Sequence, residues 1–237
     1  VYASRMAAKV DSAALQDGFQ IYHHVMFFDR AGNWCVVQQG MREQDGLARR
    51  YHWLSEGLTS FVEEPHRGVV GPQAGLVLNL VAQEAAPARE AIPELSQRPP
   101  EKTVGDLKKL TQLRLPRRHA LLLSDVNPCR LKGVLLRAYQ AQANDFEQLL
   151  GVAGLGAKGL RALALVAELI YGAPASFRDP ARFSYAHGGK DGTPYPVDRD
   201  TYDRTIQALR RAVQRARLGR QQEISALRRL ATTFAAP

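Results

Sequence analysis

The sequence predicts an α+β protein, and three features support this fold class. Two runs rich in aromatic and β-branched residues, 21–28 and 34–39, flank a short polar turn, which is typical of a β-hairpin. From residue 104 onward apolar residues recur with helical spacing. Between these regions the composition shifts to proline and charged residues, which indicates a connection. We therefore expect an α+β part at 1–83, a Pro-rich linker at 84–103 and a helical part at 104–237.

The N-terminal part contains further predicted elements. Residues 1–16 are rich in alanine and predict a helix or a loop. Residues 48–54 and 75–81 predict two more strands. In the run 21–28 both alternating faces carry apolar bulk. We therefore expect a sheet that is covered on both sides, with one histidine of the His-His pair pointing each way.

Most of the C-terminal part is predicted to be helical, with an irregular loop at 172–197. The predicted helices are 105–113, 116–123, 127–142, 145–152, 157–171, 201–218 and 221–230.

Composition limits the classes of function. The chain of 237 residues has a formal net charge of +9 and a pI of about 9.8, which favours a polyanionic partner. Its two cysteines stand far apart, which fits a reducing cytoplasm better than a disulfide framework or a zinc knuckle. No run approaches the roughly 18 apolar residues of a transmembrane helix, so we expect no membrane partner. The chain opens at Val1 without a methionine, and we expect it to be a fragment that lacks an N-terminal region.

The most specific motif lies between two predicted helices, within residues 145–171. Gly154 and Gly156 allow a tight reversal of the chain, because glycine takes positive φ at little cost. The first N–H groups of the second helix, the helix dipole and Lys158 then form an anion pocket. This pattern is similar to a helix-hairpin-helix motif, which binds the sugar-phosphate backbone of DNA; the alternative is an ordinary helical hairpin. The predicted DNA contacts in the hairpin are Gly154, Leu155, Gly156, Ala157, Lys158 and Gly159.

Arginines of the predicted helix 201–218 extend this hypothesis. Arg204, Arg211 and Arg215 share one side of the helix, because seven and four residues are helical neighbour spacings. Guanidinium groups match phosphate oxygens in pairs, so we expect these arginines to contact DNA. A solvated helix face is an equally good interpretation. We expect the side chains of Arg49 and Arg50 to lie at the protein surface and not in a site.

One candidate for catalysis combines Lys158 with Asp198. A loop rich in glycine and proline follows the hairpin and ends in Pro-Val-Asp, so the region resembles the helix-hairpin-helix DNA glycosylases. In the bifunctional members of that superfamily the hairpin lysine attacks the sugar and the aspartate stabilises the sugar cation. The two residues are 40 positions apart (198 − 158), which is longer than the usual spacing. The alternative is that Asp198 caps the next helix.

The second candidate is a group of acidic and imidazole side chains before residue 70. Carboxylates and imidazoles on neighbouring strands can bind Mg²⁺ or Mn²⁺, which activates water for phosphodiester cleavage. No spacing within the group is diagnostic, and a packing role for each histidine is the alternative. The group is Asp11, Asp17, His23, His24, Gln38, His52, Glu63, Glu64 and His66. From it we predict Asp11, Asp17, His24 and Gln38 as catalytic residues and Asp11, Asp17 and His24 as ligands of the divalent metal.

Several stretches together resemble one prokaryotic family. They are YASRMAAKVD, LQDGFQIYHH, WCVVQQGM, ARRYHWLS, FVEEPH, LLGVAGLGAKGLRAL, AHGGKDGTPYPVD and RTIQALRRAVQRARLG. Through them the chain is similar to the family catalogued as domain of unknown function 763, over nearly its whole length except the linker and the extreme C-terminus. Members of that family are longer at the N-terminus. The resemblance implies a prokaryotic protein but no activity beyond association with DNA through the hairpin, and the cysteine content adds the expectation of a cytoplasmic location.

The sequence leaves three functions open, all with DNA as the partner. The first is a metal-dependent nuclease of DNA processing or repair. The second is a DNA glycosylase or abasic-site lyase that uses Lys158 and Asp198. The third is a DNA-binding module without catalysis.

Overall fold

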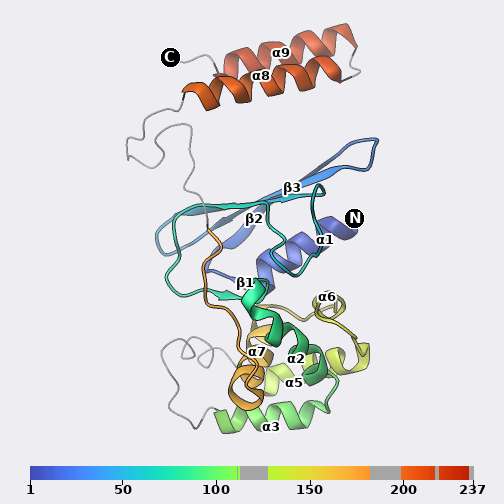
Figure 1. Ribbon diagram of the computed structural model, residues 1–237, viewed down its shortest axis with the longest axis vertical. Helices are drawn as coiled ribbons and strands as arrows, with labels where there is room; N and C mark the ends of the chain where they lie inside the picture. Colours follow the sequence, from blue (N-terminus) through green and yellow to red (C-terminus); the bar gives the residue numbers. More distant parts are fainter. Residues whose placement is uncertain (111, 113–127, 182–198, 217–218, 235–237) are drawn as a thin grey trace. The chain divides into compact units, whose positions relative to one another are not determined.

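The computed structural model shows an α+β protein, which confirms the predicted fold class (Figure 1). It describes residues 1–110, 112, 128–181, 199–216 and 219–234. The chain divides into two compact units, residues 1–184 and 185–237, and each is described by itself.

The first unit begins with a helical segment that ends in a wide turn. Helix α1 (Tyr2–Lys9) runs directly into the π-helical turn η1 (Val10–Ala14) and the short strand β1 (Leu15–Gln16). The buried side of this segment is small and apolar, with Ala7 and Ala14 fully excluded from solvent. π-Helical turns occur often at functional sites, and this one carries the buried Asp11.

The main sheet is antiparallel with strand order β2-β3-β4-β5. Its strands are β2 (Gln20–Phe28), β3 (Trp34–Met41), β4 (Ala48–Leu54) and β5 (Gly68–Val70). The three longer strands confirm the predicted ones. The predicted strand 75–81 shrinks to the two residues of β6 (Leu78–Asn79), which pairs with β1 in a second small sheet.

The two faces of the main sheet differ in burial. On the inner face Gln38, Tyr51 and Trp53 are fully buried, and α1 contacts β2 and β3 (Figure 1). On the outer face His23 and Phe27 are exposed. Among the described residues the prediction of a sheet covered on both sides is therefore wrong, because apolar bulk on a face does not require a helix over it.

The segment predicted as a Pro-rich linker is folded. It forms the 3-10 turn η2 (Gln83–Ala85), helix α2 (Ala86–Ser96) and the start of α3 (Pro100–Leu110). Proline is tolerated in the first turn of a helix, where its missing N–H is not needed, and α2 has a proline there. Ile92 and Leu95 are buried, and α2 packs against α7, so this segment is part of the core.

Helix α7 (Ala157–Tyr171) is the centre of the helical region. It contacts α2, α3, η1 and α5 (Pro128–Ala141), and its residues from Leu160 to Ala167 are almost all buried. The short helix α6 (Phe146–Leu150) precedes it. These helices agree with the predicted ones, whereas the predicted helix 116–123 lies outside the described residues.

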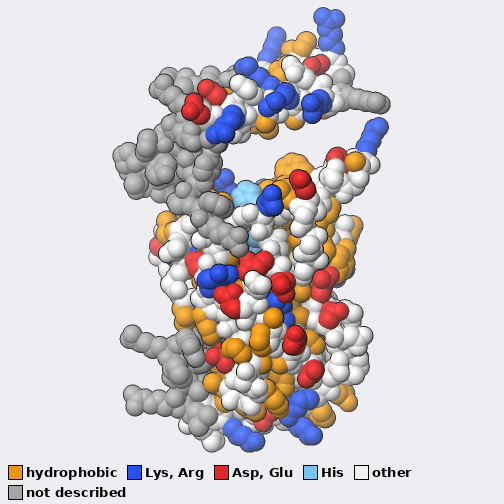
Figure 2. Space-filling view, in the orientation of Figure 1, with side chains coloured by type: hydrophobic (Ala, Val, Ile, Leu, Met, Phe, Trp, Pro, Cys, Tyr) orange, Lys and Arg blue, Asp and Glu red, His pale blue; other side chains and the backbone are white. Residues whose placement is uncertain are grey.

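The second unit consists of α8 (Arg199–Arg215) and α9 (Arg220–Phe234), which pack against each other. Figure 2 shows lysine and arginine side chains along this helix pair. Within the described part of the chain, no helix is both long and apolar enough to span a bilayer.

Candidate functional site

The carboxylate of Asp11 lies at the centre of a polar network on the inner face of the main sheet. The residue is only 1% exposed. Its Oδ1 accepts a hydrogen bond from His66 Nε2 at 2.5 Å, and its Oδ2 accepts one from Trp53 Nε1 at 2.9 Å and another from Gln38 Nε2. Donors from three separate segments thus satisfy both oxygens of a side chain that would be strongly destabilising if it were buried alone.

The network continues from Gln38 toward the surface. His24 Nδ1 lies 2.9 Å from Gln38 Oε1, and His24 Nε2 lies 2.7 Å from Ser4 Oγ. Three of the four predicted catalytic residues, Asp11, His24 and Gln38, therefore belong to one series of hydrogen bonds. The fourth predicted catalytic residue, Asp17, does not belong to this series.

Asp17 lies in a separate ion-pair cluster. Its Oδ2 accepts hydrogen bonds from Arg49 Nη1 at 2.8 Å and Tyr51 Oη at 2.6 Å. Arg49 Nη2 also donates to Asp179 Oδ2 at 2.8 Å. The side chains of Arg49 and Asp17 are 0% and 1% exposed, so this is a buried pair with a second carboxylate at its edge.

The two carboxylates around Arg49 respond differently to their surroundings. Burial raises the pKa of Asp17, although Arg49 and Tyr51 act in the opposite direction. Asp179 is less deeply buried: burial acts to raise its pKa, but hydrogen bonds from Arg49 and from two backbone N–H groups outweigh it, and the pKa lies below its ordinary value. Arg49 Nε has no hydrogen-bond partner among the described residues.

The predicted metal ligands Asp11, Asp17 and His24 do not share a site. Both oxygens of Asp11 and both ring nitrogens of His24 already have hydrogen-bond partners, and Asp17 faces a guanidinium that repels cations. Among the residues that the structure describes, no group of three or more His, Cys, Asp or Glu is arranged to hold a metal ion. As arranged, these residues do not fit Mg²⁺ or Mn²⁺.

The other members of the predicted acidic and histidine group, His66 apart, lie away from Asp11. His23 is exposed and His52 half-buried on the outer face of the sheet, Glu63 pairs with Arg89 at 2.6 Å, and Glu64 pairs with Arg178 at 3.0 Å. Burial, and after it the charge of Arg50, lowers the pKa of His52. The group therefore contains several structural pairs and does not form one centre.

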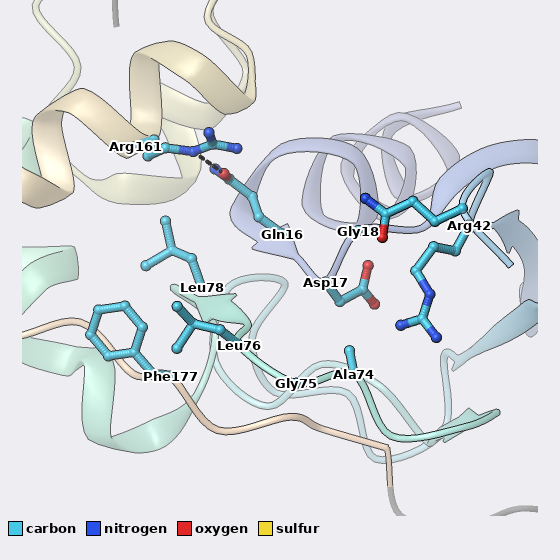
Figure 3. Close-up of a pocket in the computed structure, with 11 residues that line it drawn as sticks. Gln16, Asp17, Gly18, Arg42, Ala74, Gly75, Leu76, Leu78, Arg161 and Phe177 are labelled. Atoms are coloured by element: carbon cyan, nitrogen blue, oxygen red, sulfur yellow. Dashed lines mark hydrogen bonds between the residues drawn. The ribbon is translucent and has the colours of Figure 1, made fainter. Parts of the chain in front are cut away.

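A cavity of about 310 Å³ opens beside Asp17 (Figure 3). Its polar lining includes Gln16, Asp17, Arg42 and Arg161, and its apolar lining includes Leu76, Leu78 and Phe177. Arg161 Nε of α7 donates to Gln16 Oε1 at 2.8 Å, so the helical region and the N-terminal region meet at this cavity. The volume is near the lower end of the range for small-molecule sites.

The turn between α6 and α7 presents a helix N-terminus without a side-chain cap. Gly154 has φ +82°, and Gly156 is the N-cap of α7 and makes no side-chain hydrogen bond. The exposed Lys158 follows in the first turn of the helix. The guanidinium of Arg137 lies against Gly154, since a Cβ at that position would be 2.6 Å from Arg137 Nη2. One cationic side chain thus lies in the first turn of α7, and another lies against the glycine turn that precedes the helix.

Side chains from the N-terminal region hold the carbonyl groups of this turn. Lys9 Nζ donates to Leu155 O at 3.0 Å, and Gln16 Nε2 donates to Ala157 O at 2.9 Å. Leu155 is fully buried, and a Cβ on the buried Gly159 would lie 2.8 Å from Leu155 Cδ1. Two predicted DNA contacts, Leu155 and Gly159, thus face the core and can offer a ligand only their backbone.

Replacing Gly154 with alanine is expected to destabilise the protein by about 1–3 kcal/mol, because the positive φ is unfavourable for alanine. The new Cβ would also displace Arg137. Thermal unfolding followed by circular dichroism measures the change. The control is Gly133→Ala in α5, where the Cβ meets nothing within 4 Å and the helix should gain stability. Equal melting temperatures for the two variants would contradict the positive φ at residue 154.

The other predicted site residues lie outside these clusters. Arg204, Arg211 and Arg215 are exposed on α8 in the second unit. Asp198 lies outside the described residues.

Several residues of the site were missed by reasoning from sequence. Arg49 was interpreted as surface, yet it is fully buried. Alternation along β4 contains the signal, because Arg49, Tyr51 and Trp53 are spaced two apart and share the inner face. Ser4 and Asp179 carry no such signal, since their partners come from distant parts of the chain.

A family model described as "Protein of unknown function (DUF763)" matches residues 1–197. No curated protein and no solved structure matches the chain.

Proposed function

The chain belongs to the DUF763 family, whose function is unknown, and we propose that it binds the sugar-phosphate backbone of DNA through the α6–α7 hairpin.

The observation that carries this proposal is the uncapped start of α7, which has Lys158 in its first turn and Arg137 against the preceding glycine turn. The first N–H groups of a helix have no acceptor within the helix, and here the N-cap Gly156 supplies no side-chain acceptor. The helix dipole adds positive potential at the same point. Lys158 lies in the first turn, and Arg137 lies against Gly154 in the turn before it. These groups together suit a phosphate oxygen.

The donors of the hairpin favour backbone binding over sequence reading. N–H groups and cations contact phosphates, whereas discrimination between bases requires side chains that reach base edges. Lys9 and Gln16 fix the carbonyl side of the turn, so its N–H side is pre-organised. The exposed arginines Arg204, Arg211 and Arg215 and the net charge of +9 support a polyanionic partner of the whole chain.

The experiment is a salt titration of binding to a labelled duplex by fluorescence anisotropy. The logarithm of the binding constant is expected to fall linearly with the logarithm of salt concentration, and Lys158→Gln should reduce the slope by about one unit. Lys102→Gln is the control, because it removes the same charge from an exposed position on α3. Binding that does not depend on salt would contradict the proposal. Equal salt slopes for Lys158→Gln and Lys102→Gln would show that the hairpin does not contact the DNA.

The exposed amine of Lys158 favours one second candidate, an abasic-site lyase in which this lysine forms a Schiff base with the sugar. Borohydride trapping on abasic DNA, compared between the wild type and Lys158→Gln, tests it. Binding to intact duplex without any trapped adduct would leave backbone binding as the function of the hairpin. Metal-dependent cleavage has no such support, since the predicted ligands are engaged with other partners.

A further inference from the structure

A serine and a histidine form the outer end of the network centred on Asp11. Ser4 Oγ lies 2.7 Å from His24 Nε2, and His24 Nδ1 lies 2.9 Å from Gln38 Oε1. Ser4 is half-buried on α1 and His24 is exposed on β2, whereas Gln38 is fully buried. A hydroxyl, an imidazole and an amide therefore follow one another from the surface to the interior.

The direction of each hydrogen bond in this series follows from Asp11. A carboxylate only accepts, so Gln38 turns its NH₂ group toward Asp11 and its Oε1 toward His24. Because Oε1 also only accepts, the neutral ring of His24 carries its proton on Nδ1. His24 Nε2 is then an acceptor, and the Ser4 hydroxyl donates to it.

A second serine on the same helical segment shows the ordinary behaviour of a hydroxyl. Ser12 Oγ donates to Ala8 O, one turn earlier, at 2.6 Å. Ser4 donates instead to a base on another element, and that base is oriented by a buried amide. The hydrogen bonds thus connect a nucleophile to a base, and the base to a group that orients it. This arrangement activates serine in acyl transfer.

We infer that Ser4 and His24 form a catalytic site for the hydrolysis of carboxylic esters, separate from the hairpin proposed to bind DNA. Ser4 Oγ forms a bond to the ester carbonyl carbon while its proton moves to His24 Nε2. The bond from that carbon to the oxygen of the leaving alcohol breaks, and this oxygen takes the proton from His24. Water then attacks the acyl-serine with His24 as the base, which releases the acid and restores both residues. Gln38 and Asp11 position the imidazole.

The partners of this pair favour an ester over a phosphodiester. Within the described part of the chain, the side-chain hydrogen bonds of Ser4 and His24 go to each other and to the neutral Gln38. Phosphoryl transfer depends on cationic groups that neutralise the charge of the transferred phosphoryl group. Attack on an ester carbonyl carbon develops a single negative charge on the carbonyl oxygen, and neutral N–H or O–H donors can stabilise this charge without a cationic group.

The test uses a fluorophosphonate probe, which phosphonylates activated serines, on the chain of 237 residues. Mass spectrometry of the digested protein is expected to find the label on Ser4. His24→Gln should slow both this labelling and the hydrolysis of p-nitrophenyl acetate by about 10²- to 10⁴-fold. Ser4→Ala should abolish both, and the control Ser12→Ala should change neither. Circular dichroism verifies that the variants, which all alter residues with exposed surface, remain folded.

A cysteine substitution gives an independent measurement. Ser4→Cys is expected to react with iodoacetamide about tenfold faster than Ser12→Cys, because the neighbouring imidazole promotes thiolate formation. Label on other residues, a labelling rate that is unchanged in His24→Gln, absence of label on the folded protein, or equal alkylation rates would each overturn the inference.

Discussion

Arg49→Ala is expected to lower the free energy of unfolding by about 3–5 kcal/mol, because it leaves the carboxylates of Asp17 and Asp179 without their cationic partner. The guanidinium also donates to Pro72 O at 2.6 Å and lies over the ring of Phe19 at 4.6 Å, and both contacts would be lost. Urea denaturation followed by tryptophan fluorescence measures the change. Arg49 is 0% exposed, so water cannot replace the missing donors without opening the core.

The matched control is Arg50→Ala, which removes the same side chain from the exposed face of the same strand and should change stability by no more than about 0.5 kcal/mol.

Lowering the pH should reduce the difference in the free energy of unfolding between the wild type and Arg49→Ala. The pKa of Asp179 is lowered in the folded protein, so its contribution is present above the ordinary value of 3.8 and is lost as the pH falls through the lowered value. If Arg49→Ala and Arg50→Ala lowered the free energy of unfolding by similar amounts, the buried ion pairs of Arg49 would contribute no net stability.

Asp11→Ala is expected to destabilise the protein by a similar amount, about 3–5 kcal/mol. It leaves three donors, on His66, Trp53 and Gln38, facing a side chain that cannot accept. The ¹H NMR signal of the Trp53 indole N–H provides a local measurement, because the loss of its acceptor should move the signal upfield.

The control for this substitution is its neighbour in η1, Ser12→Ala. Ser12 is exposed, and among the described residues its hydroxyl bonds only to its own helical segment, so its removal should leave both stability and the indole signal unchanged. If the indole signal of Asp11→Ala kept its position, the bond from Trp53 to Asp11 would not exist in solution.

Much of the fold could be predicted because its signals are local. The bounds of β4 and α7 agree with the predicted runs 48–54 and 157–171, since strand alternation and helical periodicity are read from neighbouring residues. The Pro-rich segment was misread for the complementary reason. Its prolines suggest a connection, but the apolar side of α2 fits against α7, and this packing outweighs the local preference.

Part of the candidate site was also contained in the sequence. The β2–β3 hairpin pairs Phe28 with Trp34, and four residues further from the turn on each strand His24 pairs with Gln38. The register of a hairpin follows from its turn, so the contact between these two predicted residues is a consequence of the turn at 29–33.

The sequence by itself determined the fold class, most of the helices and strands, the glycine turn before α7 and the contact of His24 with Gln38. Only the tertiary structure decided that Asp11 meets His66 and Trp53, that Asp17 and Asp179 share Arg49, and that Ser4 lies against His24. The physical reason is that a buried charge or polar group is stable only where donors and acceptors converge on it. These partners come from segments 20 to 130 residues apart, which no local pattern connects.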